Sequence, residues 1–200
     1  MNALAQGLDT PILRCSVCGS ERLAAPEWFS QLTLALRHEH HARSDSVQTA
    51  LDIFLEPEIM SDEFRWVCDN AACPRPRQRP TFRHNLTTKP DVLCIQLKRW
   101  SNDPTTGALT HETQDVLCND ELHCQGQAYD LRSVICHIGG TVKTGHYTCR
   151  VHHPASAGTW WYYNNSHRRL ATPAEVNATA RVRGNVERAY LVFYEKRSAT

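Results

Sequence analysis

The chain has 200 residues, of which 41% are hydrophobic and 22% are charged, and its formal net charge is +1. This length is enough for one substantial core, or for one core with an appended subdomain. The composition is typical of a soluble globular protein. A net charge near zero does not favour binding to nucleic acid or to an anionic membrane, so we expect neither partner.

The N-terminal segment has neither the basic region nor the apolar run of a signal peptide, and no stretch is long and apolar enough to span a bilayer. Without an export signal, the nine cysteines are expected to be thiols or metal ligands and not disulfides. This favours a cytoplasmic or nuclear location. The glycosylation patterns at Asn85 and Asn177 have little significance there.

The first half of the chain predicts a strand, a loop and a helix. Partial alternation of apolar residues predicts a strand over 28–36, and the polar, histidine-rich segment 37–43 predicts an exposed loop. Apolar residues at a helical spacing predict a short helix over 46–55, which either Asp45 or Ser46 can cap.

The second half is dominated by predicted strands. A polar loop is predicted over 101–113. A helix is predicted after Thr172, with Pro173 at its first position and Glu175 completing a capping box. Apolar and alternating runs predict strands over 91–100, 129–138, 146–151, 160–163 and 189–194. The order of these elements predicts a mostly antiparallel α+β fold with a cysteine-bearing extension.

Two close pairs of cysteines predict a metal site. Two residues separate Cys15 from Cys18, four separate Cys68 from Cys73, and about 50 positions lie between the pairs. Each pair can bind one side of a tetrahedral zinc ion, and Gly19 follows the first pair where such a turn requires a positive φ. Four thiolates leave no open position for water, which predicts a structural zinc. The alternative is four free thiols.

The other five cysteines divide into two groups. Cys94, Cys136 and Cys149 lie in apolar strand patterns and are expected to be small core residues. Cys118 and Cys124 flank a polar segment and are expected to lie in a loop. With the intervening histidine they form a weaker alternative set of metal ligands.

Several motifs occur in an order that resembles one enzyme family. Gly-His-Tyr-Thr at 145–148 follows a strand-like run at 129–139, and Trp-Trp-Tyr-Tyr-Asn-Asn-Ser occupies 160–166. The segment 89–100 ends in Leu-Lys-Arg-Trp, and 189–194 is Ala-Tyr-Leu-Val-Phe-Tyr. Together these motifs resemble the histidine box and its neighbours in ubiquitin-specific cysteine proteases.

The resemblance implies a papain-like architecture of thumb, palm and fingers. The range 12–88 would form zinc-ribbon fingers, with Cys15, Cys18, Cys68 and Cys73 at their tips, and 89–195 would form the mostly antiparallel palm. In this family, ubiquitin lies between fingers and palm, and a cysteine attacks the carbonyl at the C-terminus of ubiquitin. Ubiquitin and ubiquitinated proteins are therefore the expected partners.

The resemblance also assigns catalytic roles. His146 would be the general base that draws the proton from the thiol, and Asn164 would accept a hydrogen bond from the imidazole and orient it. Asn165 occupies the position where the family often has aspartate. His137 is the competing candidate for the base, but its place inside a strand predicts a structural role.

The family's cysteine box, an Asn-Thr-Cys-Tyr-like motif, occurs nowhere in these residues. We therefore expect the thumb to be missing and the chain alone to be inactive. Two hypotheses remain: part of a deubiquitinase, or a catalytically dead scaffold that binds ubiquitin. A third, a zinc-ribbon protein that binds nucleic acid, has only the cluster Arg75, Arg77, Arg79 and Arg83 in its support.

Overall fold

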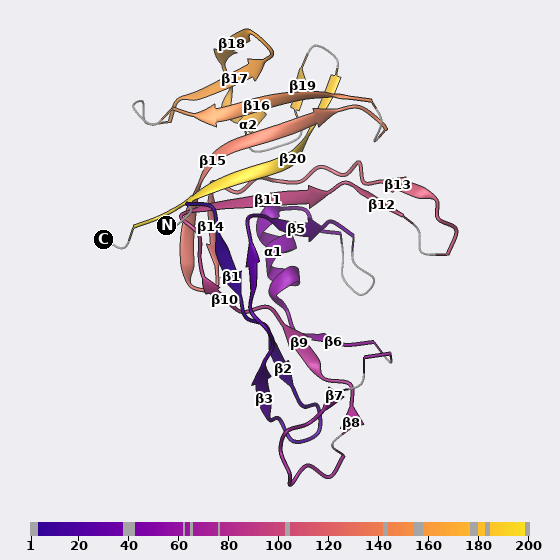
Figure 1. Ribbon diagram of the computed structural model, residues 1–200. Helices are drawn as coiled ribbons and strands as arrows, with labels where there is room; N and C mark the ends of the chain where they lie inside the picture. Colours follow the sequence, from indigo (N-terminus) through magenta and orange to yellow (C-terminus); the bar gives the residue numbers. More distant parts are fainter. Residues whose placement is uncertain are drawn as a thin grey trace.

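The computed structural model describes residues 4–37, 43–61, 63–64, 66–75, 77–102, 105–141, 144–153, 158–176, 180–182 and 185–198. Its largest element is a nine-stranded sheet, which extends across the upper part of Figure 1. The strands of this main sheet are β5 (Leu32–Ala35), β11 (Val92–Lys98), β14 (Glu121–Cys124), β15 (Gln127–Ile138), β16 (His146–His152), β17 (Trp160–Asn164), β18 (His167–Leu170), β19 (Ala180–Val182) and β20 (Asn185–Lys196).

The main sheet is mostly antiparallel, as the sequence predicts. Its strands follow the order β18-β17-β16-β15-β20-β11-β5, with β14 paired to β15 and β19 paired to β20. Only β5 and β11 pair in parallel among these strands. The longest strands, β15 and β20, lie side by side at the centre, so they fix the positions of the strands on both sides of them.

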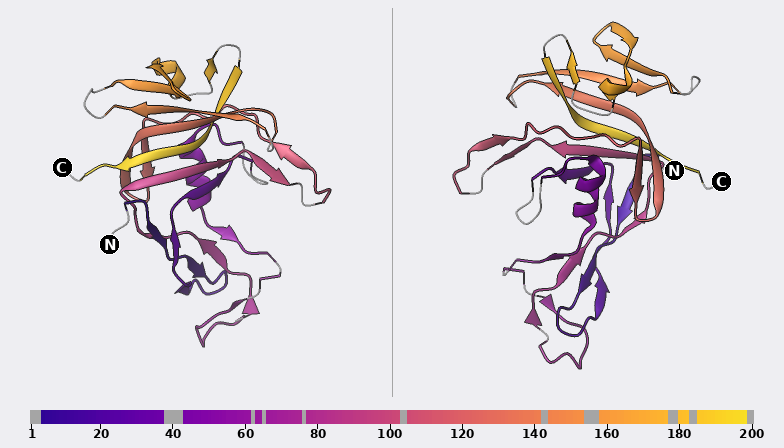
Figure 2. Two further views of the ribbon diagram at one scale, coloured as in Figure 1. Left: turned by 45° about the horizontal axis from the view of Figure 1, so that its top comes forward. Right: turned by 180° about the vertical axis from the view of Figure 1, so that it is seen from behind.

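One face of the main sheet carries the core. Along β11 the buried residues Leu93, Ile95 and Leu97 alternate with more exposed ones, which places an apolar row on one face. Helix α1 (Val47–Leu55) covers this face beneath β5 and β11 (Figures 1 and 2).

Helix α1 begins as predicted. The side chain of Ser46 accepts a hydrogen bond from the Thr49 N–H at 3.1 Å, so Ser46, and not Asp45, is the N-cap. Helix α2 (Pro173–Val176) follows Thr172, and the Glu175 carboxylate accepts from the Thr172 N–H at 2.8 Å, as a capping box requires. Neither helix is long enough to cross a membrane, and no other helix occurs in the described ranges.

A smaller lobe projects away from the main sheet, at the bottom of Figure 1. This lower lobe contains the four-stranded sheet β3-β2-β9-β6 and the pair β7-β8, and a three-stranded sheet, β10-β1-β4, lies between it and the main sheet. The bounds are β1 (Gly7–Asp9), β2 (Ile12–Arg14), β3 (Glu21–Leu23), β4 (Glu27–Phe29), β6 (Glu58–Ile59), β7 (Trp66–Val67), β8 (Arg77–Gln78), β9 (Thr81–Arg83) and β10 (Leu86–Thr88).

The five strands predicted in the second half are confirmed as β11, β15, β16, β17 and β20. The single strand predicted over 28–36 is wrong, because the chain forms two strands in two different sheets. Trp28 on β4 is 67% exposed and pairs with β1, whereas Leu32 and Leu34 on β5 are buried beside β11. The chain bends between these environments at Ser30, which the alternation of apolar residues did not indicate.

The loop predicted over 101–113 is also wrong in part. Strands β12 (Trp100–Asn102) and β13 (Leu109–His111) form a hairpin there. The rings of Trp100 and His111 stack with centroids 4.8 Å apart, and the hydroxyls of Ser101 and Thr110 lie 2.8 Å apart. These cross-strand pairs stabilise a hairpin whose composition is that of a loop. Most of the loop predicted over 37–43 lies outside the described residues.

The predicted division into fingers over 12–88 and palm over 89–195 stays a prediction. Both β5 and α1 come from within the first range, yet they pack on the main sheet and not in the lower lobe.

Candidate functional site

His146 and Asn164 form a hydrogen-bonded pair at one end of the main sheet. His146 is the first residue of β16, Asn164 is the last residue of β17, and the two strands are antiparallel neighbours. The pairing brings the two side chains together, with His146 Nε2 2.7 Å from Asn164 Oδ1. Both residues are half-buried, so the pair is supported by the sheet and still open to a reactant.

This geometry defines the chemistry of the imidazole. Because Asn164 presents an oxygen, Nε2 carries the hydrogen and donates it. In the neutral ring Nδ1 then has a free lone pair, and no hydrogen bond to Nδ1 occurs within the described residues. The pair therefore has the form of a general base whose second nitrogen is held by an amide.

A buried polar network lies behind Asn164. Its Nδ2 donates to the Tyr162 hydroxyl at 3.3 Å, and that hydroxyl donates to Glu187 Oε1 at 2.8 Å. Glu187 also accepts from Thr148 at 2.8 Å and forms an ion pair with Arg150 at 2.5 Å. Sequence reasoning missed this network, although an arginine and a glutamate inside otherwise apolar strands were a signal for it.

The two charged side chains of this network are buried. The side chains of Arg150 and Glu187 are 0% and 1% exposed, so each charge depends on the other for its stabilisation. Burial, together with the hydrogen bond to Glu187, raises the pKa of Tyr162, which keeps its hydroxyl protonated.

Asn165 does not join the pair. It is exposed in the turn between β17 and β18 and adopts a φ of 51° in the left-handed region, which asparagine tolerates better than most residues. No hydrogen bond joins it to His146 within the described residues. The structure thus brings together His146 and Asn164 from the predicted set and leaves Asn165 at the surface.

His137 is buried among aromatic side chains. It is 7% exposed, and its ring lies 5.0 Å from the Trp100 ring and 5.1 Å from the Tyr147 ring. Burial lowers its pKa. A Cβ at Gly145 would lie 1.9 Å from His137 Nε2, so the ring packs directly against the backbone that precedes His146. His137 therefore supports the position of the base.

None of the nine cysteines bonds to His146 within the described residues. Cys118 and Cys124 were expected in a loop. Cys118 does lie outside the strands, whereas Cys124 is the last residue of β14. Both are 1% exposed in the core of the main sheet, and burial raises their pKa values to about 12 and about 11. Their alternative role as metal ligands is also unsupported, because the only metal-type cluster within the described residues is elsewhere.

Of the three cysteines expected in the core, Cys136 belongs to the buried cluster, whereas Cys94 and Cys149 do not. Burial raises the pKa of Cys136 to about 12, and it also raises those of Cys94 and Cys149, which are half-buried. A thiol with a raised pKa is a poor nucleophile at neutral pH.

The lower lobe brings Cys15, Cys18, Cys68 and Cys73 together, with all four sulfur atoms within 4.8 Å of one another. The Sγ atoms of Cys15 and Cys73 are 3.8 Å apart, and those of Cys18 and Cys68 are 3.7 Å apart. A tetrahedral zinc ion with Zn–S bonds of about 2.3 Å separates its ligands by about 3.8 Å. The cluster therefore fits such an ion.

The surroundings of the four sulfurs also suit a cation. Burial tends to raise the pKa of the Cys15 thiol, but the N–H groups of Cys18 and Val17 donate to its sulfur and lower the pKa to about 6. The Gln78 amide donates to the same sulfur. Gly19 has a φ of 74°, which confirms the positive φ expected after the first pair.

The pKa of the Cys68 thiol changes in the opposite direction to that of Cys15. The N–H of Asn70 lowers its pKa, but burial and the neighbouring sulfurs outweigh this and raise it to about 12. Four thiolates at these distances repel one another unless a cation lies among them.

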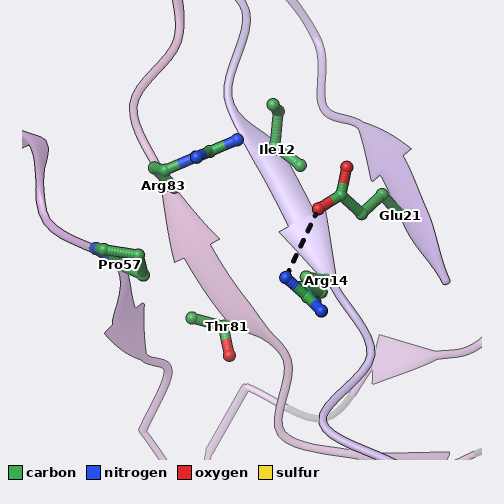
Figure 3. Close-up of a pocket in the computed structure, with 6 residues that line it drawn as sticks. All are labelled: Ile12, Arg14, Glu21, Pro57, Thr81 and Arg83. Atoms are coloured by element: carbon green, nitrogen blue, oxygen red, sulfur yellow. Dashed lines mark ion pairs between the residues drawn. The ribbon is translucent and has the colours of Figure 1, made fainter. Parts of the chain in front are cut away.

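A small hollow occupies one face of the four-stranded sheet in the lower lobe (Figure 3). Thr81 and Arg83 lie on β9, and Arg14 lies opposite Thr81 on the adjacent strand β2. A carboxylate oxygen of Glu21 is 4.0 Å from the Arg14 guanidinium. Its volume is about 50 Å³, too small for a drug-sized ligand.

The ubiquitin carboxyl-terminal hydrolase model matches residues 2–194. A protein described as ubiquitin carboxyl-terminal hydrolase 4 from Eremothecium gossypii is 27% identical over 98% of this chain and 24% of its own length. Ubiquitin carboxyl-terminal hydrolase 12 from Saccharomyces cerevisiae is 31% identical over 78% of this chain and 12% of its own length. The chain thus spans a quarter or less of the length of these relatives.

Solved structures show the same fold. The chain is similar to the SAGA DUB module that contains Ubp8, bound to monoubiquitin, with a TM-score of 0.79, 22% identity and coverage of 98% of this chain and 41% of that chain. The form of the module bound to ubiquitin aldehyde gives a TM-score of 0.78 at 21% identity, over 98% of this chain and 42% of that chain. The architecture is accordingly that of a papain-like ubiquitin-specific protease domain. The match to the family model over nearly the whole chain shows that the chain belongs to the ubiquitin carboxyl-terminal hydrolase family.

Proposed function

We propose that these residues supply the general base, His146, and its orienting partner, Asn164, for a thiol-dependent deubiquitinase. The observation that carries the proposal is the hydrogen bond from His146 Nε2 to Asn164 Oδ1, which leaves Nδ1 free to accept a proton. The family membership of residues 2–194 supports the reaction class.

The reaction begins when His146 Nδ1 takes the proton of a cysteine thiol. The thiolate attacks the carbonyl carbon at the C-terminus of ubiquitin, and the imidazolium returns the proton to the leaving amine as the isopeptide bond breaks. His146 then removes a proton from water, which hydrolyses the thioester. Asn164 keeps the ring in position throughout and stabilises the imidazolium without a charge of its own.

The nucleophile is not among the nine cysteines of this chain. Cys94, Cys118, Cys124, Cys136 and Cys149 have pKa values raised by burial, and the remaining four lie together in the lower lobe. The proposal therefore assigns the nucleophile to a segment that carries the family's cysteine box.

The lower lobe has the form of zinc-ribbon fingers in this proposal. Cys15, Cys18, Cys68 and Cys73 would hold the zinc through four thiolates, which leaves no position for water. An ion held there would supply folding energy to the lobe and would take no part in hydrolysis.

The proposed partners are ubiquitin and ubiquitinated proteins, bound between the lower lobe and the main sheet. Two similar solved structures are bound to monoubiquitin and to ubiquitin aldehyde, which supports this choice. All nine cysteines are free of disulfides, which suits a reducing location in the cytoplasm or nucleus.

A second candidate function is an inactive scaffold that binds ubiquitin. The observation that favours it is the absence of a hydrogen bond between His146 and any cysteine in the described part of the chain. This function requires ubiquitin binding and no turnover under any reconstitution.

Reconstitution with a separately expressed segment that carries the cysteine box tests the proposal. Hydrolysis of a fluorogenic ubiquitin amide should appear only when both parts are present. His146→Ala should reduce kcat/KM by about 10²- to 10⁴-fold, because the thiol loses its proton acceptor, and Asn164→Ala should reduce it less. The exposed His123, which pairs with Glu121, gives the matched control His123→Ala, with no change expected.

Ubiquitin binding without hydrolysis in the reconstituted complex would favour the scaffold. Full activity in the His146→Ala complex would show that the base is a different residue, and His137→Ala would then be measured.

A further inference from the structure

The side-chain amide of Asn164 has two orientations, in which its oxygen and nitrogen exchange places. With Oδ1 toward His146, the amide accepts from Nε2–H, and Nδ1 is left with a lone pair. With Nδ2 toward His146, the amide donates to Nε2, and the neutral ring then carries its hydrogen on Nδ1. A base that faces its reactant through Nδ1 works only in the first orientation, so some group must select that orientation.

The directions of the hydrogen bonds in the buried network select the orientation of the Asn164 amide, beginning at Glu187. Its carboxylate is 1% exposed and forms an ion pair with the Arg150 guanidinium 2.5 Å away. An ionised carboxylate only accepts hydrogen bonds. The Tyr162 hydroxyl, 2.8 Å from Glu187 Oε1, must therefore donate its single hydrogen to that oxygen.

The next link follows from the first. Because the only hydrogen of the Tyr162 hydroxyl is directed to Glu187, its oxygen can only accept from other groups. Asn164 Nδ2 lies 3.3 Å from this oxygen and is the donor, which turns Oδ1 toward His146 Nε2 at 2.7 Å. Each group along the path has one possible role, so the direction of every hydrogen bond from Glu187 to His146 is determined.

We propose that Glu187 and Tyr162 are positioning residues that fix the Asn164 amide, and through it hold neutral His146 in the tautomer protonated at Nε2. The inference rests on the proposed function for its significance, but the tautomer is a property of this chain alone. Burial raises the pKa of Tyr162, which supports a hydroxyl that remains a donor. Thr148 donates to Glu187 Oε2 at 2.8 Å and lies off this path.

The ¹⁵N NMR spectrum of the histidine rings in the 200-residue chain tests the proposal, with the His146 signals assigned by their loss in His146→Ala. At a pH where the ring is neutral, His146 should show a protonated Nε2 and an unprotonated Nδ1. Tyr162→Phe removes only the linking hydroxyl and should raise the population protonated at Nδ1 several-fold. Thr148→Val removes a buried hydroxyl from the same carboxylate and should leave the tautomer unchanged.

A second substitution rescues the first. In Tyr162→Phe/Asn164→Asp, the aspartate has two oxygens and no amide nitrogen, so it accepts from Nε2–H without help from Tyr162. The double variant should return His146 to the tautomer protonated at Nε2, which a merely structural role of Tyr162 does not predict.

An unchanged tautomer in Tyr162→Phe would overturn the proposal, as would an equal change in Thr148→Val. If Tyr162→Phe does not fold, the His146 tautomer is measured in Glu187→Gln, where the same increase of the population protonated at Nδ1 is expected. It neutralises the group that only accepts, so an unchanged tautomer in that variant would also overturn the proposal. The spectra need neither nucleophile nor substrate, so failure of the proposed function in the turnover assay is distinguishable from failure here.

Discussion

The two chemically specialised regions of the molecule are held together in opposite ways. His146 and Asn164 lie on a sheet whose core cluster contains 22 buried residues, and the central strands β15 and β20 are each 12 residues long. The cysteine site lies among strands of two or three residues, and its buried cluster consists of Trp66, Cys15, Cys68 and Cys73.

The difference indicates whether the fold determines the chemical site or the site determines the fold. In the main sheet, the apolar core and the strand pairing position the histidine and the asparagine, so the fold determines the site. In the lower lobe the buried cluster consists mainly of cysteines, so a zinc ion bound by them, as we propose, would determine the fold. The two regions should therefore respond differently to local changes.

The largest expected effect is the removal of one of the proposed zinc ligands. Cys68→Ala should release the metal and unfold the lower lobe, because a structural zinc contributes about 10 kcal/mol of binding free energy that is also folding energy. Hydrogen exchange should become fast in β2, β3 and β6–β9 and stay slow in β15 and β20. Cys94→Ala, outside the cluster, is the matched control. Slow exchange in the lower lobe of Cys68→Ala would contradict the comparison.

The next effect concerns the backbone beside the base. In Gly145→Ala the new Cβ would lie 1.9 Å from His137 Nε2, so either the His137 ring or the backbone before His146 must move. We expect the backbone to move, because the Trp100 and Tyr147 rings pack against the buried His137 ring. A displacement of about 1 Å is enough to cost about a hundredfold in rate, and we expect this loss in kcat of the reconstituted enzyme. Gly140→Ala, at a position where a Cβ meets nothing within 4 Å and the backbone has no positive φ, controls for the loss of a glycine. Unchanged kcat in Gly145→Ala would show that His137 does not support the base.

A smaller loss is expected at the cap of α1. Ser46→Ala removes the acceptor for the Thr49 N–H and should lower the free energy of unfolding by about 1 kcal/mol. Because the core of the main sheet is large, the His146 tautomer should stay the same. Chemical denaturation measures the first quantity and ¹⁵N NMR the second. A changed tautomer would mean that the site depends on the helix more closely than the comparison allows.

The smallest effect depends on pH. The Arg169 guanidinium beside Glu175 lowers the pKa of that carboxyl from 4.5 to about 2. A lowered pKa in the folded chain stabilises it above about pH 4.5, and this stabilisation disappears as the pH falls toward about 2. The difference in Tm between the parent chain and Glu175→Gln should therefore shrink over this interval. A difference that grows on acidification would contradict the assignment.

The sequence predicted the main sheet better than the lower lobe, for physical reasons. Buried strands such as Val92–Lys98 carry an apolar pattern, and the cap at Ser46 is a local signal. The short strands of the lower lobe are too brief for any periodicity and depend on pairing between residues distant in sequence. The spacing of the four cysteines nevertheless predicted which sulfurs come together.

Only the histidine and asparagine of the candidate site were predicted from the sequence, and the buried network behind them was not. His146 and Asn164 came from motifs, whereas Glu187 and Tyr162 behind them were missed, because a single charged residue in a strand pattern does not indicate its partner. The burial of Cys118 and Cys124 was missed because their neighbours in sequence are polar.

We propose that this chain supplies a base and its orienting partner without a nucleophile. Incubation of the 200-residue chain with a ubiquitin probe that carries a C-terminal electrophile, followed by mass spectrometry, tests it most directly. The account predicts no covalent adduct on any of the nine cysteines, and a single adduct on the added cysteine when the segment with the cysteine box is supplied. An adduct on a cysteine of this chain that disappears in His146→Ala would contradict the account.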